Sequence, residues 1–214
     1  MIKAHPTPAL LRAYAADELP LPLTVGVAAH CELCAECGAD VNVWEAELAA
    51  SHLEEAAPAP ALDAVLAAIL QQPVSHQEVQ ARPATELRVG DRGYPLPRAL
   101  ARYHQASWRR IGGIRHCRLP LAEQGIRASL LHVATGGQIP DHTHQGYELT
   151  LLLAGSLQEG EVRYQAGDFI WRDARHHHSP HTPDGCLCYI VQDAPIRFTK
   201  GLPRLLNRIS HRLY

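Results

Sequence analysis

The chain has 214 residues, of which 46% are hydrophobic and 20% are charged. This length and composition suit one large or two small globular domains and exclude a disordered chain. No apolar run is long enough to span a membrane, and the first residues lack the apolar segment of a signal peptide. We therefore expect a cytoplasmic protein without a membrane partner. Its six cysteines are then expected to be metal ligands or redox-active thiols rather than disulfides.

Charge is distributed unevenly along the chain. Residues 1–85 hold 3 basic and 11 acidic side chains, a formal charge of −8, whereas the remainder holds 17 basic and 11 acidic side chains and carries +6. An acidic surface repels nucleic acid and attracts a protein with basic surfaces. The alternative is that the acidic half only keeps the protein soluble. We expect no direct binding of nucleic acid.

The first part of the chain is predicted to be helical and to form a small bundle over residues 1–85. Its Ala- and Leu-rich sequence has helical periodicity in three stretches. These stretches are residues 7–18, 22–51 and 61–71. Residues 86–105 have a mixed sequence with two prolines, Pro95 and Pro97, and are predicted to be a linker that holds at most one short helix.

After residue 106 the pattern changes to that of short strands. Apolar runs such as YELTLLLAGSL and CLCYIVQD alternate with Gly, Pro and Asp turns, as in an all-β sandwich or barrel. We predict an antiparallel β-barrel over residues 106–200, followed by a helix or tail over residues 201–214. The expected fold class is therefore α+β, with a helical bundle before the barrel.

One spacing in the helical part indicates a metal site. His30, Cys34 and Cys37 form the pattern H-x3-C-x2-C inside the predicted helix 22–51. At about 100° per residue, steps of four and three return to nearly the same helix face, so an imidazole and two thiols converge. Nitrogen and sulfur ligands are typical of structural Zn²⁺, which takes four ligands in tetrahedral geometry. The alternative is that the cysteines are buried core residues of a reduced protein.

Two histidines are candidates for the fourth zinc ligand. His5 precedes a helix for which Thr7 is the predicted N-cap, so it can fold back across the helical bundle. His52 lies about 20 Å of helix rise beyond Cys37 and reaches the site only if the helix breaks first. We favour His5. Cys31 lies about 100° away from the shared face and is predicted to be a buried small residue or a spare thiol.

A second constellation lies in the β half. The run from Gly136 to Gly155 has the pattern G-x5-H-x-H-x3-E-x6-G, which contains His142, His144 and Glu148. Side chains two residues apart on a strand share a face, so both histidines can point into a barrel.

This run and the downstream run from Gly167 to His178 resemble the two cupin motifs. The resemblance covers about residues 106–200 and implies a second metal site with four ligands. These ligands are His142, His144, Glu148 and His178. The second motif departs from the usual pattern, because Asp173 stands in place of Pro and Arg175 in place of Gly.

The ligand set of the second site does not identify its metal. Three histidines and a glutamate suit Zn, Fe, Mn or Ni, and an open coordination position can bind a small molecule or support catalysis. A cupin that has lost its metal, or histidines that lie on the surface, are the alternatives. Cys186 and Cys188 lie at strand spacing, which allows a redox pair or two ordinary core residues.

The two sites together resemble the zinc-dependent anti-sigma factors of the ChrR type. The resemblance rests on the histidine–cysteine set in the helical part and the cupin motifs after it. It implies that the helical domain binds an extracytoplasmic-function sigma factor and blocks its access to core RNA polymerase. It further implies release of the sigma factor under oxidative stress, by singlet oxygen in this type. A non-enzymatic negative regulator of transcription is therefore predicted.

The alternative is a metal-dependent cupin enzyme. The barrel site would then hold catalytic iron or manganese in a dioxygenase or isomerase, and the helical domain would serve dimerisation.

Overall fold

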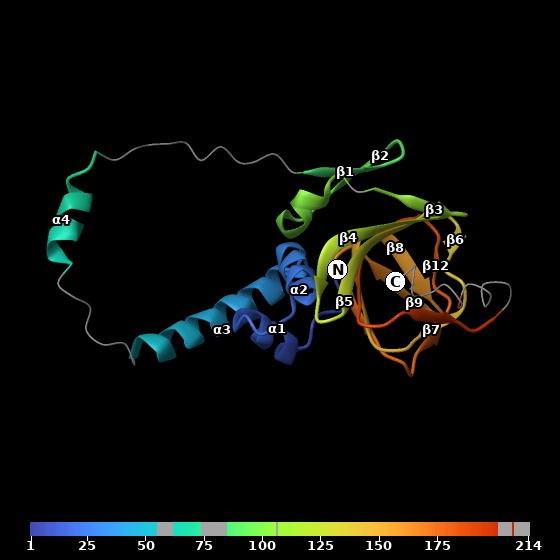
Figure 1. Ribbon diagram of the computed structural model, residues 1–214, viewed down its shortest axis with the longest axis horizontal. Coiled ribbons are helices and arrows are strands. Elements are labelled where there is room, and N and C mark those ends of the chain that lie inside the picture. The colour runs from blue at the N-terminus through green and yellow to red at the C-terminus, as the bar shows by residue number, and fades with distance from the viewer. Residues whose placement is uncertain (55–61, 74–84, 106, 201–206, 208–214) are drawn as a thin grey trace.

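The computed structural model describes residues 1–54, 62–73, 85–105, 107–200 and 207 (Figure 1). The α-helices are α1 (Pro8–Ala15), α2 (Leu21–Leu33), α3 (Ala35–Glu54) and α4 (Asp63–Leu70), and the 3-10 helix is η1 (Arg98–Tyr103). The strands are β1 (Glu86–Val89), β2 (Arg92–Pro95), β3 (Arg109–Ile111), β4 (Ile114–Glu123), β5 (Ile126–Val133), β6 (Gly137–Gln138), β7 (His142–His144), β8 (Glu148–Glu159), β9 (Val162–Gln165), β10 (Phe169–Arg172), β11 (His177–His178), β12 (His181–Thr182), β13 (Cys186–Gln192) and β14 (Ile196–Phe198).

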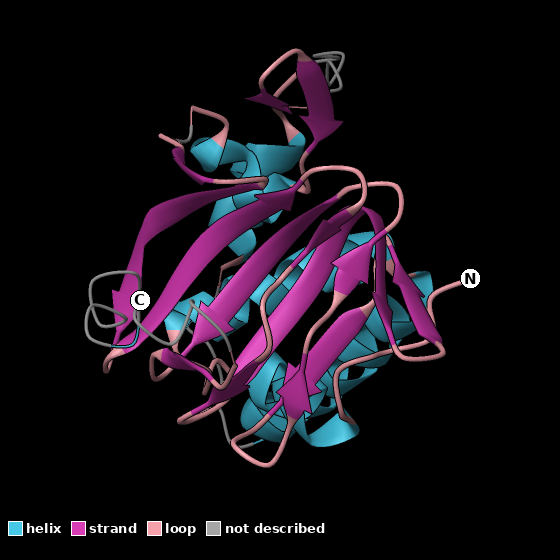
Figure 2. Ribbon diagram, turned by 90° about the vertical axis from the view of Figure 1, so that its right-hand side faces the viewer, coloured by secondary structure: helices cyan, strands magenta, loops and turns pink. Residues whose placement is uncertain are grey.

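The predicted α+β fold is confirmed, with helices first and a curled antiparallel sheet after them. The largest sheet has nine strands in the order β3-β4-β5-β13-β8-β12-β6, and β9 and β10 also pair with β8. A second sheet has the order β11-β7-β14. Figure 2 shows the long strands side by side with helices behind them. The sheet therefore has one side that helices cover and one side that faces into the barrel.

The first predicted helix is present as α1, and its start follows the expected capping chemistry. The side-chain oxygen of Thr7 accepts a hydrogen bond from the backbone N–H of Leu10 at 3.2 Å, and Pro8 is the first helical residue. This arrangement satisfies a backbone donor that the first turn leaves free.

The predicted single helix over residues 22–51 is wrong in one respect, because it is interrupted at Cys34. This residue has an extended backbone, with φ −122° and ψ 102°, so α2 ends before it and α3 begins after it. Its N–H donates to the carbonyl of His30 at 2.8 Å, and its carbonyl accepts from the N–H of Gly38 at 3.0 Å. The backbone of Cys34 thus forms the last hydrogen bond of α2 and the first of α3. The periodicity of the sequence continues across this break.

The third predicted helix is present as α4, but it does not complete a bundle. None of its residues is buried, and Figure 1 places it apart from α1, α2 and α3. The predicted three-helix bundle is therefore wrong for this helix. Helical periodicity predicts that a helix has an apolar side, but it does not say which surface covers that side.

Residues 86–105, predicted to be a linker, contain a hairpin as well as a short helix. Strands β1 and β2 pair antiparallel with Leu87 opposite Tyr94, and η1 follows. Leu87 and Leu100 are completely buried. The carboxylate of Glu32 on α2 accepts a hydrogen bond from the backbone N–H of Arg98 at 2.8 Å. The segment is therefore packed on α2, and its buried residues belong to the same core cluster as residues of α2 and the sheet.

Helix α2 packs directly on the sheet. Val27 belongs to the same buried cluster as Leu149 and Tyr189 of the sheet, and the Tyr189 hydroxyl donates to the carbonyl of Pro22 at 2.8 Å. A Cβ on Gly26 would lie 2.8 Å from Cδ2 of Leu149, so glycine permits this close approach. The helical part and the barrel share one core.

Two further predictions concern the C-terminal segment and membrane-spanning helices. The helix or tail predicted over residues 201–214 lies outside the described residues, except for Asn207. The side-chain oxygen of Asn207 accepts from the N–H of Phe198 at 2.8 Å. In the part of the chain that the structure describes, no helix is both long and apolar enough to cross a membrane.

Candidate metal centres

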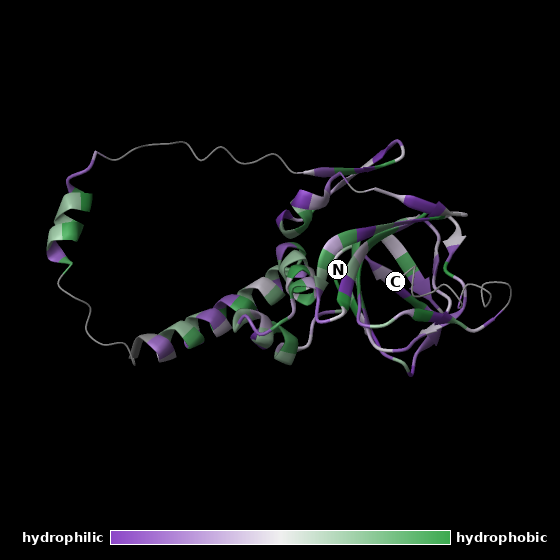
Figure 3. Ribbon diagram, in the orientation of Figure 1, coloured by the Kyte–Doolittle hydropathy of each residue, from purple (hydrophilic) through white to green (hydrophobic). Residues whose placement is uncertain are grey.

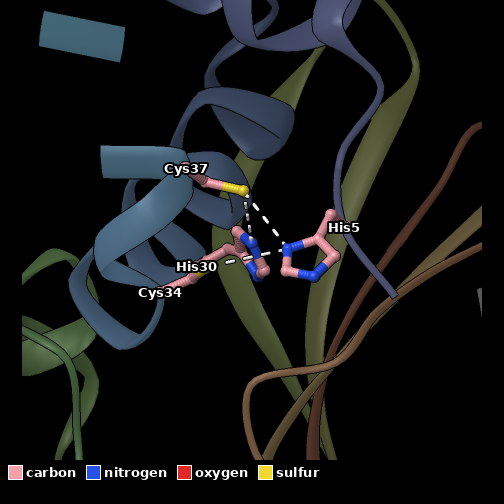
Figure 4. A group of neighbouring side chains, drawn as sticks. All are labelled: His5, His30, Cys34 and Cys37. Atoms are coloured by element: carbon pink, nitrogen blue, oxygen red, sulfur yellow. Dashed lines mark hydrogen bonds between the residues drawn. The ribbon is translucent and has the colours of Figure 1, made fainter. Parts of the chain in front are cut away.

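The four residues predicted to form the first zinc site lie together (Figure 4). The donor atoms of His5, His30, Cys34 and Cys37 all lie within 4.8 Å of one another. Sγ of Cys37 lies 3.3 Å from Nε2 of His30 and 3.3 Å from Nδ1 of His5, and Sγ of Cys34 lies 3.6 Å from the same atom of His5. The structure therefore brings the favoured histidine to the cysteines.

These distances suit a tetrahedral metal ion. Zinc bonds of about 2.3 Å to sulfur and 2.0 Å to nitrogen place neighbouring tetrahedral ligand atoms about 3.5 Å apart. Three of the four ligands are buried. Two thiolates and two neutral imidazoles would neutralise Zn²⁺ and fill a closed structural site.

The protonation behaviour of the site also fits a metal. Burial lowers the pKa of His30 to about 4, which keeps the imidazole neutral. Burial, with the adjacent Cys34 thiol, raises the pKa of Cys37 to about 12. A thiolate at this position therefore needs a nearby positive charge, which a bound dication supplies.

His30 is oriented by the barrel. Its Nδ1–H donates to the carbonyl oxygen of Gly167 at 2.8 Å, which leaves Nε2 free to face the cysteines. Gly167 has a φ of +96°, and a Cβ there would lie 2.5 Å from Cδ1 of Ile2, so only glycine suits this turn. A partner on the second ring nitrogen is the usual way to orient a histidine ligand.

The segment that carries His5 is also fastened to the barrel. The completely buried carboxylate of Asp168 accepts hydrogen bonds from the backbone N–H groups of Lys3, Ala4 and Gln165, at 2.6, 2.9 and 2.7 Å. The carbonyl of Ala4 in turn accepts from the N–H of Phe169 at 2.9 Å. The barrel turn between β9 and β10 thus positions two of the four ligands.

The two residues that sequence analysis set aside lie outside this cluster. His52 is exposed near the end of α3. Cys31 is half-buried on α2, and burial raises the pKa of its thiol to about 11. Neither belongs to the four residues whose donor atoms converge.

The four residues predicted for the cupin site also converge. The donor atoms of His142, His144, Glu148 and His178 lie within 4.8 Å of one another. Nε2 of His178 lies 3.0 Å from Nε2 of His144 and 3.0 Å from Nε2 of His142. Ring nitrogens at about 2.1 Å from one metal and at right angles to each other lie about 3.0 Å apart, so coordination of more than four ligands fits.

Burial favours the neutral imidazole at two histidines of this site, His142 and His144. Burial, followed by the neighbouring histidines, lowers the pKa of His144 to about 3 and that of His142 to about 4. Nδ1–H of His142 donates to the carbonyl of Pro140 at 2.8 Å, so its Nε2 lone pair faces the centre of the group. Burial raises the pKa of Glu148, so the ionised carboxylate needs a nearby positive charge, which a bound metal ion would supply.

Other polar residues orient these ligands. Nδ1 of His178 lies 3.2 Å from Oε1 of Glu159, whose other oxygen lies 2.8 Å from Nη2 of Arg172. The hydrogen bond to His178 and the ion pair with Arg172 lower the pKa of Glu159 to about 2. Glu148 accepts from the hydroxyl of Thr150 at 3.0 Å and from the amide of Gln192 at 2.7 Å.

The unusual second motif retains a turn that delivers His178. Asp173, where Pro is usual, is half-buried and accepts hydrogen bonds from the N–H and the guanidinium of the exposed Arg175. His176 contacts Asp173 at 2.9 Å, and His177 is exposed. Among the three consecutive histidines, only His178 joins the group of converging ligands.

Cys186 and Cys188 lie side by side on β13. Both are buried, and their sulfur atoms are 3.8 Å apart. Cys188 lines the cavity that contains the cupin ligands. The geometry leaves both interpretations from the sequence in place.

The residues that support the ligands could not be predicted from the sequence. These residues, Asp168, Glu159 and Arg172, contact partners that are distant in the sequence. No local spacing therefore predicts their role. Asp168 directly follows the motif residue Gly167, which was the one available signal.

Comparisons with known proteins agree with this geometry. Residues 97–196 match the family model described as the ChrR cupin-like domain. The chain is 37% identical over 212 residues to the anti-sigma-E factor ChrR of Cereibacter sphaeroides, which covers 96% of this chain and 97% of that protein.

Solved structures are similar as well. The crystal structure of Rhodobacter sphaeroides SigE in complex with the anti-sigma ChrR matches with a TM-score of 0.67 and 31% identity, over 90% of this chain and 100% of that chain. An RmlC-like cupin protein from Ralstonia eutropha JMP134 matches 50% of this chain and 81% of its own, with 14% identity and a TM-score of 0.41, and is too distant to indicate function. On the full-length similarity, the chain belongs to the family of ChrR anti-sigma factors.

Proposed function

We propose that the protein is a zinc-dependent anti-sigma factor that binds an extracytoplasmic-function sigma factor in the cytoplasm and keeps it from core RNA polymerase. The observation that carries this proposal is the similarity, over 90% of the chain, to ChrR in its complex with SigE. The same similarity favours a regulator over a cupin enzyme. Release of the sigma factor under oxidative stress, with singlet oxygen as the signal, completes the proposal.

The surface of the helical part supports a protein partner. Helix α4 exposes Val65, Leu66, Ile69 and Leu70, each by more than half, and Figure 3 shows the apolar character of this helix. Contiguous exposed apolar side chains mark interaction sites. With the formal charge of −8 over residues 1–85, this helix suits a partner with an apolar groove and a basic rim.

The first metal centre provides the dependence on zinc. Its ligands come from α2, from the break at Cys34, from α3 and from the segment before α1, so one ion would hold these pieces in a fixed arrangement. The sigma factor would bind the zinc-held arrangement, and loss of zinc or of the thiolates would weaken that binding. The second centre would hold zinc, iron or manganese inside the sensing barrel.

Co-purification with the cognate sigma factor tests the proposal. The zinc-loaded full-length chain is expected to form a complex and to inhibit sigma-dependent transcription in vitro. Leu66→Glu with Ile69→Glu is expected to weaken the complex by about tenfold or more, because each change places a charge in an apolar contact. Val162→Glu, at an exposed valine of the barrel, is the matched control and should leave binding unchanged.

Release of the sigma factor is tested by measuring dissociation of the purified complex. Singlet oxygen from an illuminated dye is expected to dissociate the purified complex, while the same dye in the dark does not. Absence of a complex with the zinc-loaded wild-type chain would overturn the proposal as a whole. A stable complex that resists singlet oxygen would overturn the release step alone.

A further inference from the structure

The interior of the barrel holds a cavity of about 430 Å³, within the range of small-molecule sites. Its walls are mostly apolar, with side chains from several strands. These include Leu131, Leu157, Ile170, Ile190, Ile196 and Phe198. The cupin ligands His142, Glu148 and His178 also line it. The cavity is thus a hydrophobic chamber that contains the second metal centre.

Positively charged side chains line another part of the same cavity. Arg118 and His116 lie two residues apart on β4 and share its inner face, and Arg109 on β3 pairs with His116. Both arginines are exposed, and among the described residues neither has an ion-pair partner. Arg109 and Arg118 both lower the pKa of His116, after the larger effect of burial, as expected of guanidiniums close to it.

The charged edge and the metal ligand Glu148 lie on different strands of the large sheet. Arg118 pairs with Ser129, Ser129 with Ile190, and Ile190 with Thr150, so three strand spacings separate β4 from β8. At about 4.8 Å per spacing, this is about 14 Å along the sheet. Thr150 touches the metal ligand Glu148. A ligand that fills the chamber therefore meets guanidiniums at one end and apolar walls along its length.

We propose that this cavity binds an amphipathic carboxylate, with the aliphatic chain inside the barrel and the carboxylate between Arg109 and Arg118. Guanidinium groups bind carboxylates through paired, charge-assisted hydrogen bonds, and two unpaired ones leave this end of the cavity without a counterion. The apolar walls favour a hydrocarbon chain over a polar solute. The inference goes beyond the proposed function, because it names a ligand of the barrel and needs no sigma factor.

The same two strands supply a matched control. Arg110 and Arg115 lie on the other face of β3 and β4, where they line a separate cleft of about 400 Å³ against the β1–β2 hairpin. Arg109 and Arg118 do not line that cleft. A double substitution on either face removes the same two charges from the protein, so only the position of the charges differs.

Calorimetric titration of the zinc-loaded full-length chain tests the proposal with octanoate, 1-octanol and acetate as probes. Octanoate is expected to bind at one per chain and about tenfold more tightly than either of the others. Arg109→Gln with Arg118→Gln should weaken octanoate by about tenfold and leave 1-octanol unchanged, which also shows that the cavity is intact. Arg110→Gln with Arg115→Gln should bind octanoate like the wild type.

Three results would overturn the proposal. In the first, octanoate binds the wild-type chain no more tightly than 1-octanol does. In the second, the variant without Arg109 and Arg118 keeps its full affinity for octanoate. In the third, the variant without Arg110 and Arg115 loses octanoate binding. The last result would place the carboxylate in the outer cleft. Complex formation with the sigma factor, measured on the same variants, keeps a failure here distinct from a failure of the proposed function.

Discussion

The two candidate metal centres differ in how the chain builds them. The first takes its ligands from the N-terminal segment and from both sides of the break between α2 and α3, and a barrel turn supports it. The second is built within the barrel, from β7, β8 and β11, and it faces a cavity. One centre closes a junction between parts of the chain, and the other remains accessible to a small molecule.

This difference indicates a division of roles. A closed site of two thiols and two imidazoles resembles structural zinc, whose loss is loss of local structure. A site with three histidines and a carboxylate beside a cavity leaves coordination positions open. Substitutions at the first centre should therefore affect partner binding, and substitutions at the second should affect metal content and ligands of the barrel.

The largest effect is expected from the first centre. Cys34→Ser with Cys37→Ser should lower the zinc content by one ion per chain and abolish binding of the sigma factor, because a structural zinc site contributes on the order of 10 kcal/mol to the local fold. Metal analysis and co-purification measure both. Cys31→Ser, at a cysteine outside the cluster, is the control. If the variant without zinc still binds the sigma factor, the first centre is not required for regulation.

A smaller and more selective effect is expected from the second centre. His144→Ala removes a buried ligand and should lower the metal content by one ion per chain. Binding of the sigma factor should change little, because these ligands lie inside the barrel. Metal analysis and an affinity measurement on the same preparation test this. A variant that loses the sigma factor along with the metal would show that the two centres are not separate in function.

Local patterns made much of the fold predictable. The helical periodicity of residues 7–18 and the capping residue Thr7 placed α1, and the alternating runs after residue 106 placed the sheet. The break at Cys34 and the exposure of α4 were missed. Both depend on what surrounds a helix, and periodicity carries no information about that.

Ligand spacing made the candidate sites predictable as well. Steps of three, four and two residues set which side chains converge, and the structure brings together both predicted sets of four. Metal binding by these residues stays a prediction. The supporting residue Asp168 could not be predicted, because its hydrogen bonds join positions more than 160 residues apart.

Asp168 fastens the segment that carries His5 to the barrel, and its replacement should have an intermediate effect. Asp168→Asn weakens the buried acceptor of three backbone N–H groups and should destabilise the protein by about 2–3 kcal/mol. Zinc should also leave the first centre faster, because the segment carrying His5 is less firmly held. Urea denaturation and transfer of zinc to a chromogenic chelator measure the two effects.

The control for this prediction is Asp184→Asn. Its side chain is 57% exposed, pairs with Arg163 at the surface and accepts from the hydroxyl of Ser156 at 2.9 Å. An asparagine oxygen still accepts from Ser156, so stability should change by about 0.5 kcal/mol or less. Unchanged zinc release in the Asp168 variant would mean that the barrel does not position the first centre.

The smallest effect is expected from the residue that orients His178. Glu159→Gln weakens the acceptor for Nδ1 of His178 and leaves Arg172 without its ion-pair partner. Loss of such a supporting contact typically lowers metal affinity by about 10- to 100-fold. Competition with a chelator measures this affinity, and Glu161→Gln on the adjacent turn is the control. Because Glu159 lies away from the first centre, zinc retention there should be unchanged. Weaker zinc binding at both centres in this variant would mean that the barrel transmits changes from one centre to the other.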